Sequence, residues 1–563
     1  MTNWDIACML LDTKQLLLLK KKRALASIYE KSAYSIIAME SSIHSSEDVP
    51  FLPEHIREDI DEILYKGNFS LRERLEKEIP KGMQILVRLP NIRASNVLKL
   101  YEAMNIDSVT SLSKAVNSGK LQNNKEFGVR TEEQLRKSLF LYERSKKELS
   151  LFEGYNYGRS IVLSLRANGI ERIEIAGSIR RGKEKANNIN FVISGDEKSA
   201  KDIIKNYIPY KKIEKETTGF IALKDKRNIS LKFLIVKEPY FASALIYYTG
   251  SKMHNIRIKE IALSKGFKCS KRGYFFIKGK TERDIYNQLG MQYIPPEIRE
   301  GEEEIDLALH YSLPHLIQDS DIKGDLHVHS NFSDGTNSLK EIKEEGFFHR
   351  YEYIAITDHS ESLKIANGLS EKRLLKQMQI IDRINKEKDF PILLKGSEIE
   401  INKNGSLDYG DSLHAKLDFV LCAMHSGFDD SADKNTSKLI DALSNKFVNV
   451  LAHPTGRMLG VRQGYPVNLM RVFEAAAKND VALEINLFAK RMDLSSGLIR
   501  QAKRMGVRYF SVGTDAHNVG HLNMMSYGGK VLRRAWLKKD DVINTLNIKE
   551  LKEFLCKKKP LNQ

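Results

Sequence analysis

The stretch GDLHVHSNFSDG, residues 324–335, decides the fold of the second half of this 563-residue chain. A short apolar run ends here in His327 and His329, which lie two positions apart and so project to the same side of a strand. Six further apolar runs also end in polar or ionisable residues: YIAITDHS (353–360), ILLKGSEIE (392–400), FVLCAMHSG (419–427), VNVLAHPTG (448–456), VALEINLF (481–488) and RYFSVGTDAH (508–517). Helix-length amphipathic segments separate most of these runs. This rhythm predicts a parallel β/α barrel.

The strand ends of such a barrel meet at one face, where active sites form. Here they carry eight potential ligands: His327, His329, His359, Glu398, His425, His453, Asp515 and His517. Imidazoles and carboxylates are the ligands of zinc, manganese and iron. Unrelated core histidines are the alternative, but six of the nine histidines in residues 321–563 lie at these ends. The pattern favours a site for several metal ions, which would activate water and bind phosphoryl oxygens.

Composition bounds the class of protein. With 42% apolar and 29% charged side chains, the chain is long enough for several globular domains. It contains no run of eighteen apolar residues, and the early apolar run 16–19 precedes its basic segment, so we expect neither a membrane span nor export. The four cysteines form no CxxC pair, which is typical of a reducing cytoplasm.

The net charge of +17 is unevenly distributed, because residues 151–300 alone carry +13. A basic surplus can serve solubility alone. Its concentration in one block instead indicates a surface that binds nucleic acid.

Residues 324–530 resemble the polymerase-and-histidinol-phosphatase (PHP) family, on the motifs HVHSNFSDG, TDH, GSEIE, MHS, AHP and TDAH in that order. The resemblance implies a distorted seven-stranded barrel with up to three divalent metals, manganese or zinc. It assigns one metal to His327, His329, Glu398 and Asp515. It assigns a second to Glu398, His425 and His453, and a third to Asp334, His359 and His517. It also implies that Asn486 and Arg491 contact phosphate, although an ordinary surface role for both stays open.

The front part resembles the bacterial family X DNA polymerases, on GSIRRGKE (177–184) and YYTGSKMHN (247–255). The resemblance places Gly177, Ser178 and Arg181 on the triphosphate of a nucleotide, and Tyr248 and Thr249 near its sugar and the primer end. Basic residues of the thumb-like region would follow DNA phosphates: Lys252, Arg257, Lys259, Lys265, Lys268, Lys271, Arg272, Lys278 and Lys280.

The two resemblances together imply a multidomain chain. We expect an amino-terminal helical domain (1–78), a helix-hairpin-helix region (79–150), an α+β nucleotidyltransferase-like palm (151–238), a thumb-like domain (239–300), a linker (301–322) and an α/β PHP barrel (323–563).

The palm-like part departs from its family at the catalytic positions. A family X palm has an Asp-x-Asp pair just after the GSxRRGKE segment, and Asn188 and Asn190 stand here instead. Ser230 is aligned with the third aspartate. Polymerisation by two metals needs carboxylates to neutralise and bridge two Mg²⁺ ions. We therefore expect the palm to be catalytically silent.

The two hairpin turns are also altered. The first has Pro90-Asn91-Ile92-Arg93 where a Gly-x-Gly turn would offer its amides to phosphate. The second, Lys125-Glu126-Phe127-Gly128-Val129, has one glycine where two are expected. DNA contact through these turns and a purely structural role both stay open.

Four functions compete. The first is a metal-dependent phosphodiesterase of DNA repair, a 3′-5′ exonuclease or abasic-site endonuclease acting on gapped, nicked or 3′-ended DNA. An active family X polymerase is disfavoured by the missing aspartates, a small-molecule phosphatase by the basic block, and a non-enzymatic scaffold by the full set of metal ligands. We choose the first, in a cytoplasmic, nucleoid-associated protein with no membrane contact and no obligate protein partner.

Overall fold

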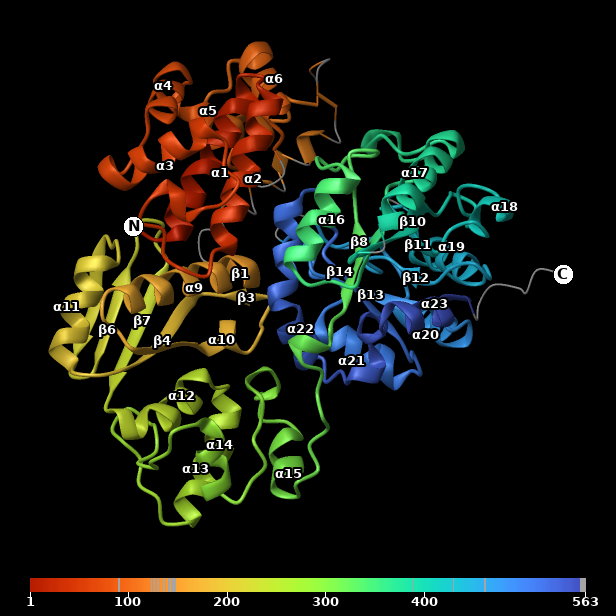
Figure 1. Ribbon diagram of the computed structural model, residues 1–563. Coiled ribbons are helices and arrows are strands. Elements are labelled where there is room, and N and C mark those ends of the chain that lie inside the picture. The colour runs from red at the N-terminus through yellow and green to blue at the C-terminus, as the bar shows by residue number, and fades with distance from the viewer. Residues whose placement is uncertain are drawn as a thin grey trace. The chain divides into compact units, whose positions relative to one another are not determined.

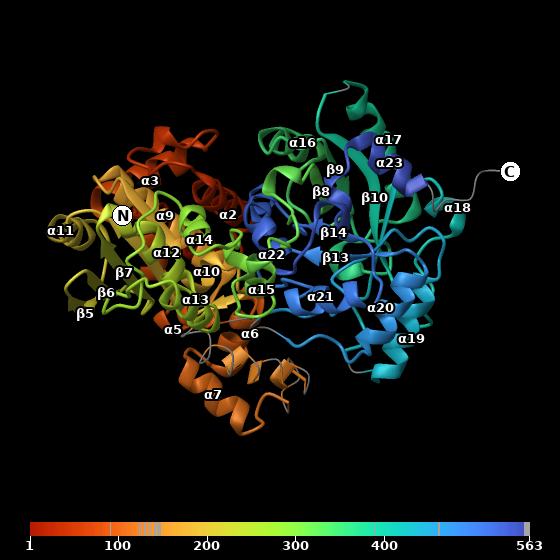
Figure 2. The ribbon, with the colours of Figure 1, turned by 90° about the horizontal axis from the view of Figure 1, so that it is seen from below.

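The computed structural model describes residues 1–89, 92–122, 148–387, 389–428, 430–459 and 462–556, with scattered residues between 124 and 142. Its internal contacts divide the chain into two units, Met1–Leu313 and Pro314–Gln563, which are described separately (Figures 1 and 2). Within the described ranges, no helix combines the length and apolarity needed to cross a bilayer.

The first unit begins with helices: α1 (Asn3–Leu19), α2 (Arg23–Ala38), α3 (Glu54–Lys66), α4 (Ser70–Glu78), α5 (Lys81–Leu86), α6 (Ala94–Met104) and α7 (Val109–Asn117). A capping box of Thr2 and Asp5 starts α1 by satisfying its free backbone amides. Leu10, Leu16 and Leu17 of this helix are fully buried. The expected helical amino-terminal region is confirmed.

The middle of unit 1 is a five-stranded sheet in the order β2-β4-β7-β6-β5. Its strands are β2 (Arg172–Ala176), β4 (Asn188–Ser194), β5 (Lys212–Thr217), β6 (Phe220–Lys224) and β7 (Ser230–Val236). β4 and β7 run parallel, and the other neighbours are antiparallel. On one face Phe191 and Phe233 stack with ring centroids 4.8 Å apart, beneath the helices α9 (Leu151–Ala167) and α11 (Glu197–Tyr207). The opposite face carries Asn188 and Asn190, because side chains alternate along a strand.

Four helices complete unit 1: α12 (Phe241–Thr249), α13 (Lys252–Ser264), α14 (Glu282–Gln288) and α15 (Glu304–Leu309). The buried carboxylate of Glu282 lies 2.7 Å from a guanidinium nitrogen of Arg180 and 2.8 Å from one of Arg299. Glu304 is also fully buried, 2.9 Å from Nδ1 of His254 on α13. The acidic segment that follows the thumb-like region therefore packs on α13 through α15.

The second unit is built on seven parallel strands in the order β14-β13-β12-β11-β10-β9-β8. They are β8 (Gly324–Val328), β9 (Tyr353–Ile356), β10 (Ile392–Glu400), β11 (Phe419–Ala423), β12 (Val450–Leu451), β13 (Ala482–Asn486) and β14 (Phe510–Gly513). The seven runs picked out in the sequence contain these seven strands. Their near-continuous apolar character fits strands that are buried on both faces.

The sheet nearly closes on itself between β14 and β8. The backbone amide of His329 donates to the carbonyl of Ala516 at 2.8 Å. Asp325 accepts from the amides of His327 and Thr514, both at 3.1 Å. At the other end, the Asn544 side chain donates to the carbonyls of Gly324 and Val512. The expected distorted seven-stranded barrel is thereby confirmed.

Helices surround this barrel: α16 (Leu339–Phe348), α17 (Glu371–Ile384), α18 (Asp411–His414), α19 (Ala432–Leu443), α20 (Leu469–Lys478), α21 (Ser496–Arg504), α22 (Gly528–Arg534) and α23 (Ile548–Cys556). Strand β9 shows how the two faces are used. Tyr353 and Ala355 belong to one buried cluster with Leu394 and Phe419, whereas Ile354 and Ile356 pack in another with residues of α16 and α17. Both faces of the sheet are therefore buried.

Candidate metal centre

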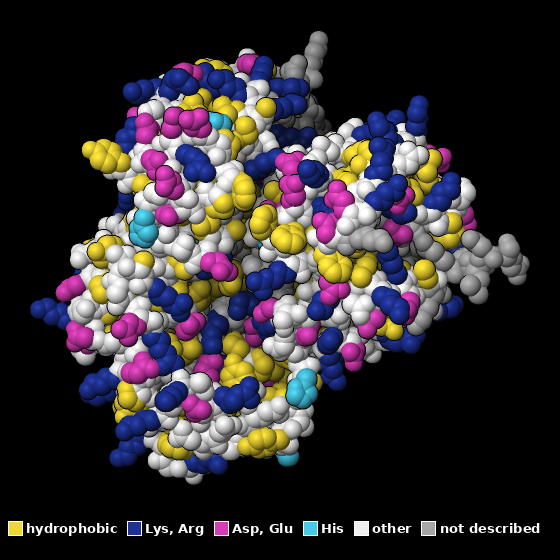
Figure 3. Space-filling model, viewed as in Figure 1, with side chains coloured by type: hydrophobic (Ala, Val, Ile, Leu, Met, Phe, Trp, Pro, Cys, Tyr) yellow, Lys and Arg dark blue, Asp and Glu magenta, His cyan; other side chains and the backbone are white. Residues whose placement is uncertain are grey.

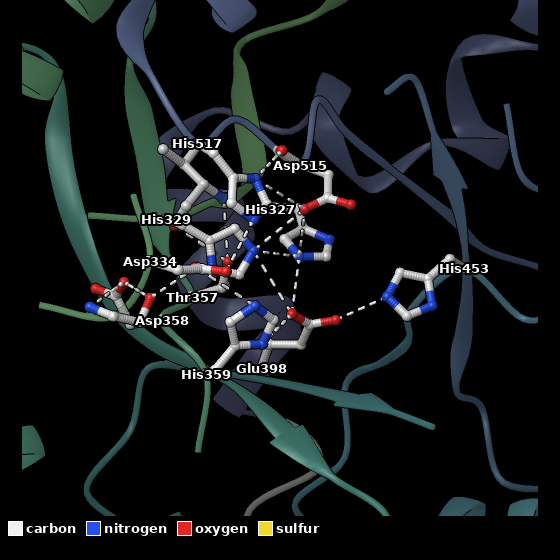
Figure 4. Close-up of polar contacts among 12 residues, drawn as sticks. His327, His329, Asp334, Thr357, Asp358, His359, Glu398, His453, Asp515 and His517 are labelled. Carbon is white, nitrogen blue, oxygen red and sulfur yellow. Dashed lines mark hydrogen bonds and ion pairs between the residues drawn. The ribbon is translucent and has the colours of Figure 1, made fainter. Parts of the chain in front are cut away.

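The nine ligands expected from the sequence come together at the carboxyl ends of the barrel strands; Figure 4 labels all of them except His425. His327 lies on β8 and Glu398 on β10; His329 directly follows β8. The other six residues lie in the segments that follow the strands: Asp334, His359, His425, His453, Asp515 and His517. His453 and Asp515 have positive φ angles of 27° and 54°, which is a strained conformation for residues other than glycine. Such strain is often found at functional sites.

Glu398 lies at the centre of the cluster. One carboxylate oxygen, Oε2, is 3.5 Å from Nε2 of both His327 and His329 and 2.9 Å from Nδ1 of His359. The other, Oε1, is 2.8 Å from Nε2 of His453 and 3.3 Å from Nε2 of His425. A single carboxylate thus faces two groups of imidazoles, as a bridging metal ligand would.

The ligand atoms form three groups, each with all its atoms within 4.8 Å of one another. They are His327, His329 and Asp515; His359, Glu398 and His425; and His329, Asp334, His359 and His517. Asp334 joins the third group with Oδ1 at 3.6 Å from His359 and Oδ2 at 3.5 Å from His517. His329 and His359 each belong to two of these groups, whereas the sequence assignment placed only Glu398 at two metal positions.

Unsatisfied buried atoms test whether these residues fit metal ions. Nδ1 of His359, Oε2 of Glu398 and Nε2 of His425 are all buried and lack a hydrogen bond, and all three belong to one group. Nε2 of His327 lies 3.1 Å from Nε2 of His329, so two nitrogens face each other. Leaving buried polar atoms unpaired is costly. Divalent cations would satisfy these atoms, so the residues fit a metal centre.

Electrostatics favour ionised carboxylates at the site. Burial alone would raise the pKa of Glu398, but His359 and His425 hold it well below its usual value. In the same way, His327 and Arg491 outweigh burial and keep the pKa of Asp515 well below its usual range. Burial lowers the pKa of His329 to about 4, whereas neighbouring carboxylates outweigh burial and raise the pKa values of His425 and His517 to about 9, so a cation would have to displace protons from these two rings. Ionised carboxylates and neutral imidazoles are the forms that bind metals.

Two further carboxylates, which sequence reasoning missed, orient the histidines. Oε1 of Glu484 lies 2.5 Å from Nδ1 of His327, and Oε2 of Glu400 lies 2.6 Å from Nδ1 of His425. Partners of this kind fix the tautomer and ring orientation of a metal-binding histidine. The available signal for Glu484 was an acidic residue between apolar neighbours in VALEINLF. Glu400 ends the run ILLKGSEIE two residues after Glu398, and so shares its face of the strand.

Asn486 and Arg491 also lie at the centre. Nδ2 of Asn486 and Nε of Arg491 donate to the same oxygen of Asp515, at 3.2 Å and 2.9 Å. Nη1 of Arg491 is buried without a hydrogen bond, which leaves a cationic donor beside the candidate metal ligands. Neither residue is therefore an isolated surface side chain.

In unit 1, Gly177 and Arg181 lie near the palm-like face that was expected to hold nucleotide. Gly177 has a φ angle of 70°, and a Cβ there would lie 2.5 Å from Nδ2 of Asn190, so only glycine fits. Arg181 is only 8% exposed. Its Nε lies 3.1 Å from Glu300, and its guanidinium also donates to the carbonyl of Thr249. In this structure Arg181 is therefore held by protein groups.

The pairing of β4 with β7 shows how the altered catalytic positions lie relative to one another. Asn188 lies opposite Ser230, and Asn190 lies opposite Lys232. All four are only partly buried, and the Ser230 hydroxyl donates to Glu214 at 2.5 Å. Sequence reasoning did not single out Lys232, although its place two residues after Ser230 puts both on one face.

The remaining residues that were expected to contact nucleotide or DNA differ in accessibility. Ser178 and Tyr248 are half-buried, Thr249 is buried and accepts from Nη1 of Arg180 at 2.8 Å, and Lys252 is exposed. Arg257 forms an ion pair with Asp306 at 2.6 Å. Figure 3 shows Lys and Arg side chains spread over the thumb-like helices, with acidic side chains between them.

Both altered hairpin turns fall partly outside the described residues. Pro90 and Asn91 of the first turn are not described, and neither are Lys125, Glu126 and Val129 of the second. Arg93 directly precedes α6 as its N-cap residue, in extended conformation.

Comparison with known proteins agrees with the division of the chain into Met1–Leu313 and Pro314–Gln563. Residues 244–300 match the DNA polymerase beta thumb family, and residues 325–487 match the PHP domain family. Over 508 residues, 88% of both chains, the sequence is 33% identical to the DNA polymerase/3′-5′ exonuclease PolX of Bacillus subtilis (strain 168). Over 247 residues it is 29% identical to a probable phosphatase of Thermoanaerobacter sp. (strain X514), which covers 42% of this chain and 95% of the relative.

Proposed function

Because the chain belongs to the bacterial family X DNA polymerases that carry a PHP domain, we propose that it is a metal-dependent 3′-5′ exonuclease of DNA repair whose palm-like part does not polymerise. The observation that carries this proposal is the convergence of eight other potential metal ligands around Glu398. DNA as the substrate is supported by the PolX relative and by the net charge of +13 in residues 151–300.

We further propose that three divalent cations, manganese or zinc, would be held by the nine residues named above. Bound there, they supply Lewis acidity and lower the pKa of water for attack on a phosphodiester. The chain's own residues orient the reaction. Glu484 and Glu400 fix the rings of His327 and His425, and Nη1 of Arg491 can bind a non-bridging phosphate oxygen.

A gel assay tests the proposal. Purified full-length protein would be incubated with 5′-labelled gapped, 3′-tailed and abasic duplexes, in Mn²⁺ or in EDTA. We expect a ladder that shortens from the 3′ end in Mn²⁺ and intact DNA in EDTA. A single cut at the abasic position would assign the endonuclease activity instead. Hydrolysis that continued in EDTA would contradict a metal-dependent site.

A small-molecule phosphatase is the second candidate, and a specific observation favours it. The probable phosphatase of Thermoanaerobacter matches 247 residues of this chain over 95% of the relative's length. That match covers only 42% of this chain, so more than half of the chain has no counterpart in the relative. Activity on phosphomonoesters with none on DNA would favour this candidate over the exonuclease.

A further inference from the structure

The face of the palm-like sheet opposite Phe191 and Phe233 carries four neighbouring polar side chains. Asn188 and Ser230 are paired at the start of β4 and β7, and Asn190 and Lys232 are paired two residues further along. Residues two apart on paired strands share a face, so these four side chains lie together. Beyond them the same face is closed, because Val192 and Leu234 pack with Phe241 of α12. The four residues therefore occupy the accessible end of the face.

Lys232 is the charged residue of this group of four. In register it is flanked by Asn190 on one side and by Ala222 of β6 on the other, and Asn190 is flanked in turn by Ala176 of β2. Within the described part of the chain, Lys232 forms no ion pair. The acid nearest in register, Glu214, is already engaged by the Ser230 hydroxyl and by Lys224 at 3.4 Å.

Two arginines and one lysine in the segment between β2 and β4 have acidic protein partners. Arg180 is held by Glu282 through two contacts of 2.7 Å, and Arg181 is held by Glu300. Lys183 lies 3.6 Å from the same Glu300. The face therefore presents the ammonium of Lys232 beside two neutral amides, and Lys215 lies in the same row of the sheet, paired with Ala222. Such a face is a poor environment for a divalent cation and a favourable one for an anion.

We propose that this face binds a phosphate ester directly, with the ammonium of Lys232 in the place where a metal-dependent polymerase would use a divalent cation. An ammonium–phosphate contact is a charge-assisted hydrogen bond, and the amides of Asn188 and Asn190 can donate to the remaining oxygens. The phosphate belongs either to a DNA strand or to a nucleotide, since both present the same group. The inference rests on the proposed function insofar as the palm-like part contacts DNA without extending it.

Binding without divalent cations tests this site. Full-length protein in EDTA, which also stops hydrolysis, would be titrated with fluorescent gapped DNA in one arm and with a fluorescent deoxynucleoside triphosphate in the other. Lys232→Ala would be compared with Lys198→Ala, which removes an exposed lysine of α11. We expect Lys232→Ala to weaken binding at least about threefold and to reduce the log–log salt slope for DNA by about 0.9, one phosphate contact. Lys198→Ala should behave as the wild type.

The two arms identify the source of the phosphate. Weaker DNA binding assigns it to a strand, and weaker triphosphate binding assigns it to a nucleotide. Lys232→Arg, which keeps the charge, should retain most of the affinity and separates loss of charge from loss of fold. If Lys232→Ala bound both probes as Lys198→Ala does, the phosphate site would be wrong. Exonuclease activity in Mn²⁺ would then still stand, so this failure is distinct from failure of the proposed function.

Discussion

Nδ1 of His327 lies 2.5 Å from Oε1 of Glu484, although strand β14 separates β13 from β8 in the sheet. The other oxygen of Glu484 accepts from the backbone amide of His453 at 2.6 Å. One buried carboxylate therefore orients the ring of one proposed metal ligand and the backbone of another. Its negative charge also raises the pKa of His327 well above the ordinary value, against the effect of burial.

Replacement of this carboxylate should weaken metal binding. We expect Glu484→Gln to raise the dissociation constant for Mn²⁺ by roughly 10- to 100-fold, because such partners fix the ligand ring and increase its basicity. Excess Mn²⁺ should restore most of the exonuclease activity. Titration of activity and calorimetry against Mn²⁺ would measure the shift. Glu371→Gln, at an exposed position of α17, is the matched control. An unchanged Mn²⁺ titration would show that Glu484 has no orienting role.

Removal of two ligands should abolish the nuclease. His327→Ala/His329→Ala takes two imidazoles from one ligand group and leaves Asp515 alone there. The loss of activity should exceed the roughly 100-fold that the loss of an orienting partner costs. Excess Mn²⁺ should not restore it. The control is His44→Ala/His310→Ala, which removes two exposed histidines outside the barrel. Degradation of 3′-tailed DNA at the wild-type rate by the first variant would place the active site elsewhere.

Much of this site could be predicted from the sequence because all strands of a parallel barrel end at one face, so residues at strand ends meet there. His327, Glu398 and His453 are far apart in sequence, but each lies at or near a strand's carboxyl end. The contact between Arg181 and Glu300 could not be predicted, since it joins residues 119 positions apart through loops. The place of Lys232 depends on which residues of β4 and β7 pair, and sequence alone does not fix that register.

The buried carboxylate of Asp493 should make stability depend on pH. Burial raises its pKa to about 6, although Thr455 donates to it through its amide at 3.0 Å and its hydroxyl at 2.9 Å. A raised carboxylate pKa means that folding is favoured while the group is protonated. That contribution is lost as pH rises from about 4 to about 6.

Asp493→Asn keeps an oxygen that can accept from Thr455 and removes the charge. At pH 7 it should therefore stabilise the fold by up to about 3 kcal/mol, because each pKa unit corresponds to about 1.4 kcal/mol. At pH 4 the variant and the wild type should melt together. Thermal unfolding at both pH values measures the difference. A variant that was less stable than the wild type at pH 7 would contradict the expected cost of the buried charge.

Removal of unit 1 should weaken DNA binding but leave the hydrolysis of a small phosphodiester intact. A chain that starts at Pro314 keeps the Ile317 amide on the carbonyl of Leu537 and Asp319 beside Arg533. It should hydrolyse a small phosphodiester at nearly the full-length rate. Its affinity for gapped DNA should fall at least about tenfold at 0.1 M salt, with a shallower salt slope because phosphate contacts are lost. Equal DNA affinity of the two proteins would exclude a binding role for unit 1.

The full-length protein should not extend a primer. Polymerisation by two metals needs negative ligands, and the palm-like face offers two amides, a hydroxyl engaged by Glu214 and an ammonium. One oriented electrostatic contact is worth roughly 3–4 kcal/mol in a transition state, so this loss should exceed a hundredfold in rate. The test uses the His327→Ala/His329→Ala background, since exonuclease trimming would mask slow extension.

Restoring carboxylates in that background asks whether they alone are missing. Because Ser230 lies opposite Asn188 and holds the place of the third aspartate, the triple change Asn188→Asp/Asn190→Asp/Ser230→Asp places three carboxylates on one face. It should allow template-dependent extension of a gapped duplex with Mn²⁺ and deoxynucleotides. Asn188→Asp/Asn190→Asp/Lys232→Asp leaves the Ser230 hydroxyl at the aligned third position and should extend far less. If the unrestored parent extended primers as fast as a polymerase with all three aspartates, the palm-like part would be an active polymerase.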